Sequence, residues 1–211
     1  MVILGIDPGS VVTGYGVIEH QNRRNRLITS GCLRPDPKLA FAQRLLKIYD
    51  GLLELVSDVS PDEVALETVF YGANVQTMMK LCHARGVIVL ALANSAVPVY
   101  EYAPREVKKA VVGKGSASKE QVRFMMQRMF QDSDIPDTLD VTDAIAIALC
   151  HAHQKVVPIA GGKPRKVRLQ DQLEALKDQN RGRQRLEDKL KSAGVDAQSR
   201  RRLIQSKRRG R

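Results

Sequence analysis

Four acidic residues lie in or at the end of apolar segments, where a carboxylate is not needed to keep the protein soluble. Asp7 closes the first apolar run of the chain, and Glu67 lies within a second. Asp140 and Asp143 are three residues apart in a segment that is otherwise apolar, so on a helix they project from one side. An unpaired buried carboxylate is strongly disfavoured, and a hard divalent cation such as Mg²⁺ compensates it. The pattern therefore indicates a metal site built from four acids.

Taken singly, some of these acids have a structural explanation. Asp140 could cap the N-terminus of its helix, and Asp7 could be a turn residue. Asp143 and Glu67 resist such explanations because both lie within apolar segments. Four acids on two strand ends and one helix face, without matching basic neighbours in the sequence, favour the metal site over four separate structural roles.

The periodicity of apolar residues predicts the elements that must position these acids. Strands are expected at residues 2–8, 13–20, 26–34, 63–69 and 97–103. Helices are expected at residues 38–58, 75–95, 104–112, 119–130 and 140–153. Three meandering strands followed by strands that alternate with helices predict an α/β fold, with a five-stranded mixed sheet flanked by helices on both faces.

Five motifs in this order resemble the RuvC family of crossover junction endodeoxyribonucleases, which resolve Holliday junctions in bacteria. They are Asp-Pro-Gly-Ser-x-x-x-Gly-Tyr-Gly (7–16), Glu-Thr-Val-Phe (67–70), Ala-Arg-Gly-Val (84–87), the Pro-Arg-Glu-Val-Lys-Lys stretch (104–119) and Asp-Val-Thr-Asp-Ala-Ile-Ala-Ile-Ala (140–148). The resemblance runs from residue 1 to about 157. It implies a ribonuclease H-like fold, which agrees with the predicted strand order.

The resemblance implies roles for the acids. Asp7, Glu67, Asp140 and Asp143 match the family's metal-binding positions, with Mg²⁺ as cofactor, Mn²⁺ as a substitute and two ions per active site. Two ions about 4 Å apart can hold the attacking water and the leaving oxygen of a phosphodiester in line. The implied activity is paired, metal-dependent hydrolysis of two opposed strands of a Holliday junction, in recombination and repair.

Three further residues match family positions that contact DNA. Phe70 matches an aromatic that stacks on an unpaired base, although it could also be a core residue. Lys108 and Lys119 match basic residues near the scissile phosphate, although both could be ordinary solvated helix residues. Gly113-Lys114-Gly115-Ser116 lacks the spacing of a nucleotide-binding P-loop, so that reading is rejected.

The expected partners are four-way junction DNA, a second copy of the chain and the RuvA–RuvB branch-migration complex. The resemblance places the homodimer contact on helix 75–95, where Met78, Leu81 and Val89 are expected to face the second copy. No membrane partner is expected, because the run Val87–Ala93 is too short to span a bilayer. With no basic leader at the N-terminus, a cytoplasmic protein is expected.

The charge of the chain is unevenly placed. Residues 155–211 carry 18 Lys or Arg against 6 Asp or Glu, a net charge of +12, whereas residues 1–154 carry a net charge of −1. We therefore expect a nuclease domain at residues 1–157 and a basic, partly helical or disordered tail at residues 158–211. A basic tail on a neutral body suggests a polyanionic partner, usually nucleic acid.

The three cysteines, and the two histidines that follow the acidic segment 140–148, are expected to be structural. Cys32, Cys82 and Cys150 have no zinc-site spacing and are expected to be small core residues. His151 and His153 are expected at the surface or behind the acids rather than as metal ligands.

Two other classes of function remain open to test. An actin-like ATPase also uses an Asp-x-Gly turn, here Asp7 to Gly14, but it needs two such halves, and the sequence has no internal repeat. A non-catalytic junction-binding protein would not need the four acids. ATP hydrolysis would identify the first alternative, and failure to cleave a junction in Mg²⁺ would identify the second.

Overall fold

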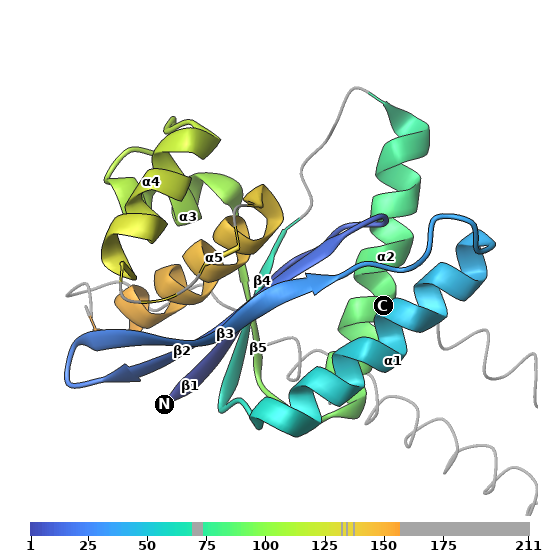
Figure 1. The fold of residues 1–211 in the computed structure, drawn as a ribbon, viewed down its shortest axis with the longest axis horizontal. Coiled ribbons are helices and arrows are strands. Elements are labelled where there is room, and N and C mark those ends of the chain that lie inside the picture. The colour runs from blue at the N-terminus through green and yellow to red at the C-terminus, as the bar shows by residue number, and fades with distance from the viewer. Residues whose placement is uncertain (69–73, 132, 134, 137, 157–211) are drawn as a thin grey trace, which may run out of the picture. The chain divides into compact units, whose positions relative to one another are not determined.

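The computed structural model describes residues 1–68, 74–131, 133, 135–136 and 138–156, all within one compact unit, Met1–Leu169. Its five strands are β1 (Val2–Asp7), β2 (Thr13–Gln21), β3 (Arg24–Leu33), β4 (Glu63–Glu67) and β5 (Val99–Tyr102). They form one sheet in the order β3-β2-β1-β4-β5 (Figure 1). The first three strands are antiparallel, and β1, β4 and β5 run parallel, which confirms the predicted mixed sheet.

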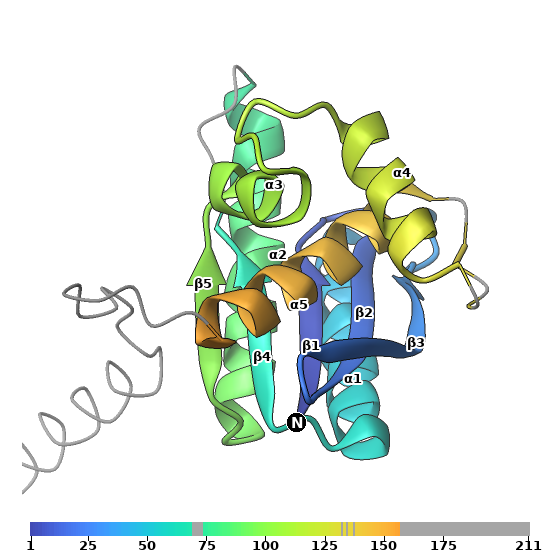
Figure 2. The same cartoon turned by 90° about the vertical axis from the view of Figure 1, so that its left-hand side faces the viewer.

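Helices cover both faces of this sheet. Those on one face are α1 (Phe41–Val59) and α2 (Val75–Asn94). Those on the other are α3 (Pro104–Val112), α4 (Lys119–Met129) and α5 (Leu139–Val156). Figure 2 shows α5 lying across the sheet with α3 and α4 above it, while α1 and α2 lie behind. Helix α5, which carries Asp140 and Asp143, therefore lies between the sheet on one side and α3 and α4 on the other.

The alternation of side chains along β1 divides the core into two parts. Ile3 contributes to the core beneath α5, whereas Leu4 and Ile6 contribute to the core beneath α1 and α2. Asp7 continues the alternation that begins at Ile3, so its side chain points to the α5 side. The strand therefore directs its terminal carboxylate toward the helix that carries two of the other acids.

One strand is shorter than its pattern predicts. Residues 97–103 alternate like a strand, but β5 begins only at Val99. Pro98 precedes it and has no amide N–H to donate to a neighbouring strand. Its carbonyl still accepts a hydrogen bond from the Val64 amide, with an N–O distance of 2.8 Å. Proline thus ends the regular pairing without breaking the contact with β4.

Helix α2 is apolar on two sides, for different reasons. Its length and hydropathy would allow it to cross a membrane, judged by those properties alone. One side carries buried residues, Ala84, Ile88, Ala91 and Leu92, which pack into this chain's own core. The opposite side carries an exposed apolar stripe, which we define as Val75, Met79, Cys82, Gly86 and Leu90.

The exposed stripe corrects one sequence expectation. Cys82 is exposed rather than in the core; Cys150 is buried as predicted, and Cys32 is half-buried. Met78, Leu81 and Val89, which are expected to face a second copy, are half-buried, and Val89 packs against the chain's own core. By helix geometry these three residues lie between the stripe and the buried side at Ala84 and Ile88, so their contact with a second copy stays a prediction.

Candidate active site

The sheet brings Asp7 and Glu67 together. Strands β1 and β4 are parallel neighbours, with Gly5 beside Ala65 and Ile6 beside Leu66. The next residue on each strand is Asp7 and Glu67, respectively, so the two carboxylates close adjacent strands at the same edge of the sheet. Residues 60 positions apart in sequence thereby become neighbours.

Helix α5 reaches the same edge because the strands beneath it carry glycine. Gly14 pairs with Asp7 across β1 and β2, and a Cβ atom at Gly14 would lie 2.0 Å from the carbonyl oxygen of Asp140. A Cβ atom at Gly5 would lie 2.2 Å from the carbonyl oxygen of Ala144. No side chain fits at either position, so the first turns of α5 rest directly on the sheet. This close approach places Asp140 and Asp143 beside Asp7.

Asp140 lies within the first turn of α5, which begins at Leu139. The structure therefore does not place it ahead of the helix as an N-cap. Its charge contributes to raising the pKa of Asp7, so the two carboxylates are electrostatic neighbours. Asp140 belongs with the other three acids rather than with the helix terminus.

The loop after Asp7 is held by two side chains that the sequence did not identify. The Thr13 hydroxyl donates to the carbonyl of Gly9 at 2.9 Å, and Thr13 is buried. From α1, the Arg44 guanidinium donates to the carbonyl of Ser10. These contacts fix the turn that follows β1, and neither of them involves one of the four acids.

Burial and mutual repulsion perturb two of the acids strongly. Burial, followed by the charges of Glu67 and Asp143, raises the pKa of Asp7 to about 8. Burial, followed by the charge of Asp143, raises the pKa of Glu67 to about 7, against the lowering effects of Lys119 and of a hydrogen bond with Asp7. Carboxylates with pKa values this high are typical of functional sites, because a cation is needed to hold them ionised together.

Lys119 is the nearest cation to this cluster. Its Nζ atom lies 2.7 Å from Oδ2 of Asp143. Partial burial alone would lower the pKa of Lys119, but the hydrogen bond to Asp143 and attraction to Asp143, Asp7 and Glu67 raise it overall. Lys119 is therefore a charged partner of the acids and not merely a solvated helix residue.

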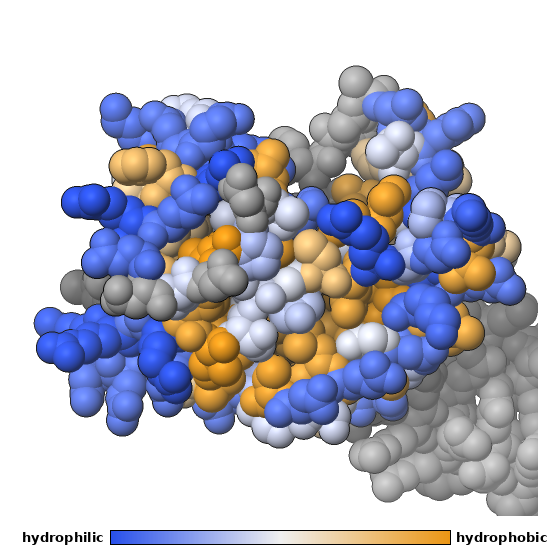
Figure 3. Space-filling model, in the orientation of Figure 1, coloured by the Kyte–Doolittle hydropathy of each residue, from blue (hydrophilic) through white to orange (hydrophobic). Residues whose placement is uncertain are grey.

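The other predicted DNA contacts are placed unevenly. Lys108 on α3 is half-buried, and its charge lowers the pKa of Glu67, so it lies within electrostatic reach of the site. Phe70 lies outside the described residues. Exposed basic side chains continue from the site over α3 and α4, where Figure 3 shows hydrophilic residues gathered at the upper left. They are Arg105, Lys109, Lys114, Lys119 and Arg128.

The donor set suits a hard cation. All four acids offer carboxylate oxygens, the ligands that Mg²⁺ and Mn²⁺ prefer. As the side chains stand, no three His, Cys, Asp or Glu residues in the described part of the chain are arranged to coordinate one ion. Burial and mutual repulsion raise the pKa values of Asp7 and Glu67, and a bound cation would offset that repulsion, so the chemistry of these donors is compatible with a metal.

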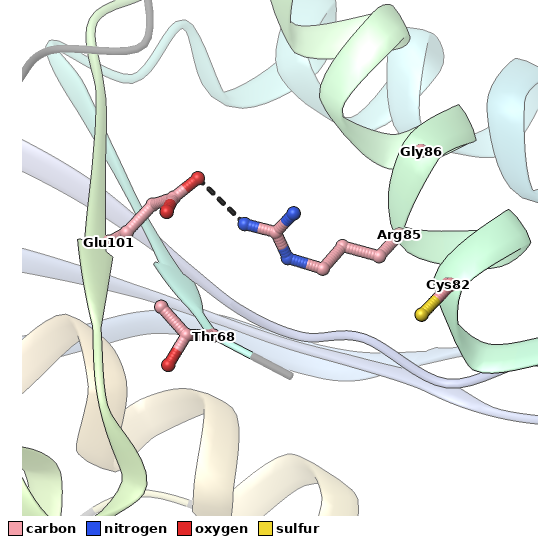
Figure 4. A pocket seen from close by; sticks show the side chains of 5 residues that line it. All are labelled: Thr68, Cys82, Arg85, Gly86 and Glu101. Atoms are coloured by element: carbon pink, nitrogen blue, oxygen red, sulfur yellow. Dashed lines mark hydrogen bonds and ion pairs between the residues drawn. The ribbon is translucent and has the colours of Figure 1, made fainter. Parts of the chain in front are cut away.

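A hollow of about 320 Å³ lies behind the acid edge, between α2 and β5. Figure 4 shows Arg85 reaching from α2 to Glu101 on β5, where the N–O distance is 2.6 Å. Thr68, next to Glu67, lines the same hollow, together with Cys82 and Gly86 of the exposed stripe. The hollow therefore lies between the exposed stripe of α2 and the end of β4 at Glu67.

Sequence reasoning missed both the glycines beneath α5 and the contact of Arg44 with the loop, although the glycines could have been recognised from their spacing. Gly14 and Gly16 alternate with Thr13 and Tyr15 along one strand, and glycines on one face of a strand indicate that another backbone approaches closely. Nothing in the sequence identified Arg44. His151 is buried rather than at the surface, and it bonds to Glu63 and to Tyr102, the β5 residue that pairs with Glu67.

Comparison with known proteins places this site in context. Residues 3–151 match the family model described as crossover junction endodeoxyribonuclease RuvC. A RuvC of Desulforamulus reducens is 47% identical over 152 residues, covering 72% of this chain and 93% of the relative. A RuvC of Legionella pneumophila (strain Lens) is 44% identical over 173 residues, covering 80% and 99%. The structure of Thermus thermophilus RuvC in complex with Holliday junction substrate superposes with a TM-score of 0.68 at 33% identity, covering 74% and 94%.

Proposed function

The chain belongs to the RuvC family of crossover junction endodeoxyribonucleases, and from this membership we propose that Asp7, Glu67, Asp140 and Asp143 are its catalytic metal-binding acids. The enzyme is a DNA-cleaving hydrolase that resolves Holliday junctions in recombination and repair. The observation that carries the assignment is the convergence of four carboxylates at one sheet edge, two of them with raised pKa values. Neither alternative class of function explains this arrangement.

The chemistry assigns the protein's groups distinct tasks. Divalent metal, which we expect to be Mg²⁺ with two ions per site, supplies an activated water and stabilises charge on the phosphate. Asp7 and Glu67 would hold the cation from the sheet, and Asp140 and Asp143 would hold it from α5. Lys119 and Lys108 neutralise the phosphate that approaches the acids. We expect Lys119 to move from Asp143 to the DNA when metal binds, because both cations compete for one carboxylate.

A cleavage assay tests this function directly. On a four-way junction, Mg²⁺ or Mn²⁺ is expected to support paired cuts in opposed strands, and a plain duplex is expected to be cut much less. Ca²⁺ is expected to support junction binding but little cutting, because its larger and looser coordination misplaces the water. Full activity in EDTA, or equal cutting of junction and duplex, would contradict the proposal.

We propose that the enzyme acts as a homodimer that joins through the exposed stripe of α2. Met79 is 55% exposed and Leu90 is 61% exposed, which is costly for apolar side chains on a long helix. Gly86 lies in the middle of this helix, where glycine is about 1 kcal/mol less favourable than alanine. A second helix packed closely on the stripe explains both features, and two active sites then face two strands.

Two further expectations rest on family membership alone. The enzyme is expected to work in the cytoplasm, and with the RuvA–RuvB branch-migration complex, which delivers a junction to it. Stacking of Phe70 on an unpaired base is also proposed, although this residue lies outside the described part of the chain.

The basic tail, residues 158–211, lies outside the described residues and gives a separate prediction. Removing the chain after Val157 is expected to leave cleavage of saturating junction nearly unchanged but to weaken binding to any DNA. The segment Arg200–Arg211 holds seven Lys or Arg and no acid, so it releases counterions when it binds phosphates. Binding measured from low to high salt is expected to show a shallower slope for the truncated chain.

Two outcomes would contradict this view of the tail. Equal salt slopes for the full-length and truncated proteins would mean that the tail does not contact DNA. Loss of cleavage at saturating junction would place the end of the nuclease domain beyond residue 157.

A further inference from the structure

A buried chain of hydrogen bonds on the α5 side of the sheet extends from Tyr102, which pairs with Glu67 between β5 and β4, to Glu63 at the start of β4. His151 on α5 is 1% exposed. Its Nε2 atom lies 2.6 Å from Oε2 of Glu63, and its Nδ1 atom lies 2.5 Å from the hydroxyl of Tyr102. The hydroxyl of Tyr100 donates to the other oxygen of Glu63 at 3.2 Å. We call these four residues the base network; it ties α5 to β4 and β5.

The pair His151–Glu63 and the acids occupy the two ends of the same two elements. Glu63 begins β4 and Glu67 ends it, a span of about 13 Å for four residues of strand. His151 and Asp143 are eight residues apart on α5, a span of about 12 Å. Because β4 and α5 run in opposite directions, the contact between His151 and Glu63 lies at one end of this pair and the acids lie at the other.

The contact between α5 and the sheet is made by both small and large residues. Ala144 and Ala148 lie on the backbone of Gly5, and Ile145 lies on Gly16. This apolar packing holds the helix against the sheet but is non-directional. Hydrogen bonds to a buried imidazole add a directional restraint, because displacement of the helix leaves buried polar groups unpaired.

The acids supply a force that the base network must resist. Asp7 and Glu67 on the sheet, and Asp143 on the helix, are half-buried near one another and repel one another when ionised. This repulsion pushes the first turn of α5 away from β1 and β4 before a cation binds. A metal site needs its ligands held within about 0.5 Å of the productive geometry.

We propose that His151, with Glu63 and Tyr102, is a positioning group for the active site, which holds α5 in place against the repulsion of the acids. The inference rests on the proposed assignment of these acids to metal. The residues of the base network touch no reacting atom; they act through the placement of Asp140 and Asp143.

The chain offers a matched pair of variants. Tyr102→Phe removes a hydroxyl that bonds to His151 on α5, whereas Tyr100→Phe removes a hydroxyl that bonds to Glu63 on the neighbouring strand. Both changes delete a single oxygen from a buried tyrosine. His151→Leu removes the whole link, and Glu63→Gln keeps an oxygen that can accept from His151.

Mn²⁺ binding measured by calorimetry without DNA separates positioning from stability. His151→Leu is expected to raise the dissociation constant about tenfold and Tyr102→Phe about threefold, as loosened support of metal ligands does. Tyr100→Phe and Glu63→Gln are expected to stay within about twofold of wild type, because the link to α5 survives. The proposal is overturned if His151→Leu melts at a lower temperature but binds Mn²⁺ as wild type does.

Hydrogen exchange without metal gives a second readout. Amides in the first turns of α5, residues 141–146, are expected to exchange faster in Tyr102→Phe than in Tyr100→Phe. Equal exchange in both variants would overturn the inference. Mn²⁺ binding that persists in Asp143→Asn would instead contradict the acid assignment, and the exchange comparison would still decide the role of His151.

Discussion

Replacing Asp143 with asparagine is expected to lower the junction cleavage rate by about a thousandfold or more while junction binding survives. The amide keeps the size of the side chain but removes the charge that pairs with Lys119 and that we propose holds metal. A thousandfold loss corresponds to about 4 kcal/mol of transition-state stabilisation, within the range expected when a catalytic cation is lost. Binding should persist because the phosphate contacts come from basic groups.

The same expectation holds for Asp7→Asn, Glu67→Gln and Asp140→Asn. Cleavage and gel-shift assays in parallel separate chemistry from binding, and Asp62→Asn, an exposed acid at the other end of β4, serves as the control. Cutting by Asp143→Asn at near the wild-type rate would show that the site has been assigned to the wrong residues. Loss of binding together with cleavage would point to misfolding instead.

Stability gives an independent readout of the same variants. Because the pKa of Asp7 is raised to about 8, the folded state disfavours its charged form. Its contribution to stability is therefore greatest below the ordinary pKa of aspartate and is lost as pH rises toward 8. At pH 8 in EDTA, Asp7→Asn should melt higher than wild type, by about 2–4 °C for each kcal/mol of repulsion removed. Mg²⁺ should raise the melting temperature of wild type much more than that of the variant.

Introducing arginine or glutamate at Gly86 is expected to convert the proposed dimer to monomer and to abolish paired cutting. A Cβ atom at Gly86 would meet nothing within 4 Å, so the isolated chain accommodates either side chain without strain. Both residues also favour helix over glycine. A second helix packed on the stripe would instead meet a bulky charge, which should weaken the dimer by about a hundredfold or more, or about 3 kcal/mol.

The two charges separate steric from electrostatic effects. Arginine and glutamate at Gly86 change DNA attraction in opposite directions, so a shared loss of dimer must come from the blocked surface. Ser57→Arg and Ser57→Glu on α1 place the same charges at an exposed position away from the stripe. Sedimentation equilibrium measures the dimer, and a cruciform plasmid distinguishes linear product from nicked circles. A stable dimer in both Gly86 variants would exclude α2 as the contact.

The sequence by itself determined the types of the elements and the chemistry of the site. Alternation in the first three strands and helical spacing in α1 are local properties, because each reflects which face of one element meets the core. The acids stood out for a similar reason: Glu67 and Asp143 are carboxylates in apolar surroundings, which one segment alone can reveal. The motifs then connected that chemistry with a nuclease family, and the comparisons confirmed the family.

Only the tertiary structure decided which residues support the acids. Lys119 pairs with Asp143 across 24 residues, and His151 pairs with Glu63 across 88; periodicity carries no information about such distant partners. For the same reason, the sequence could not show that Cys82 lies on an exposed stripe, because an apolar helix side looks alike whether its own core or a second copy covers it. Only the packing of the folded chain shows which side of α2 is buried and which is exposed. Only the fold likewise shows that the glycines of β1 and β2 set how closely α5 approaches the sheet.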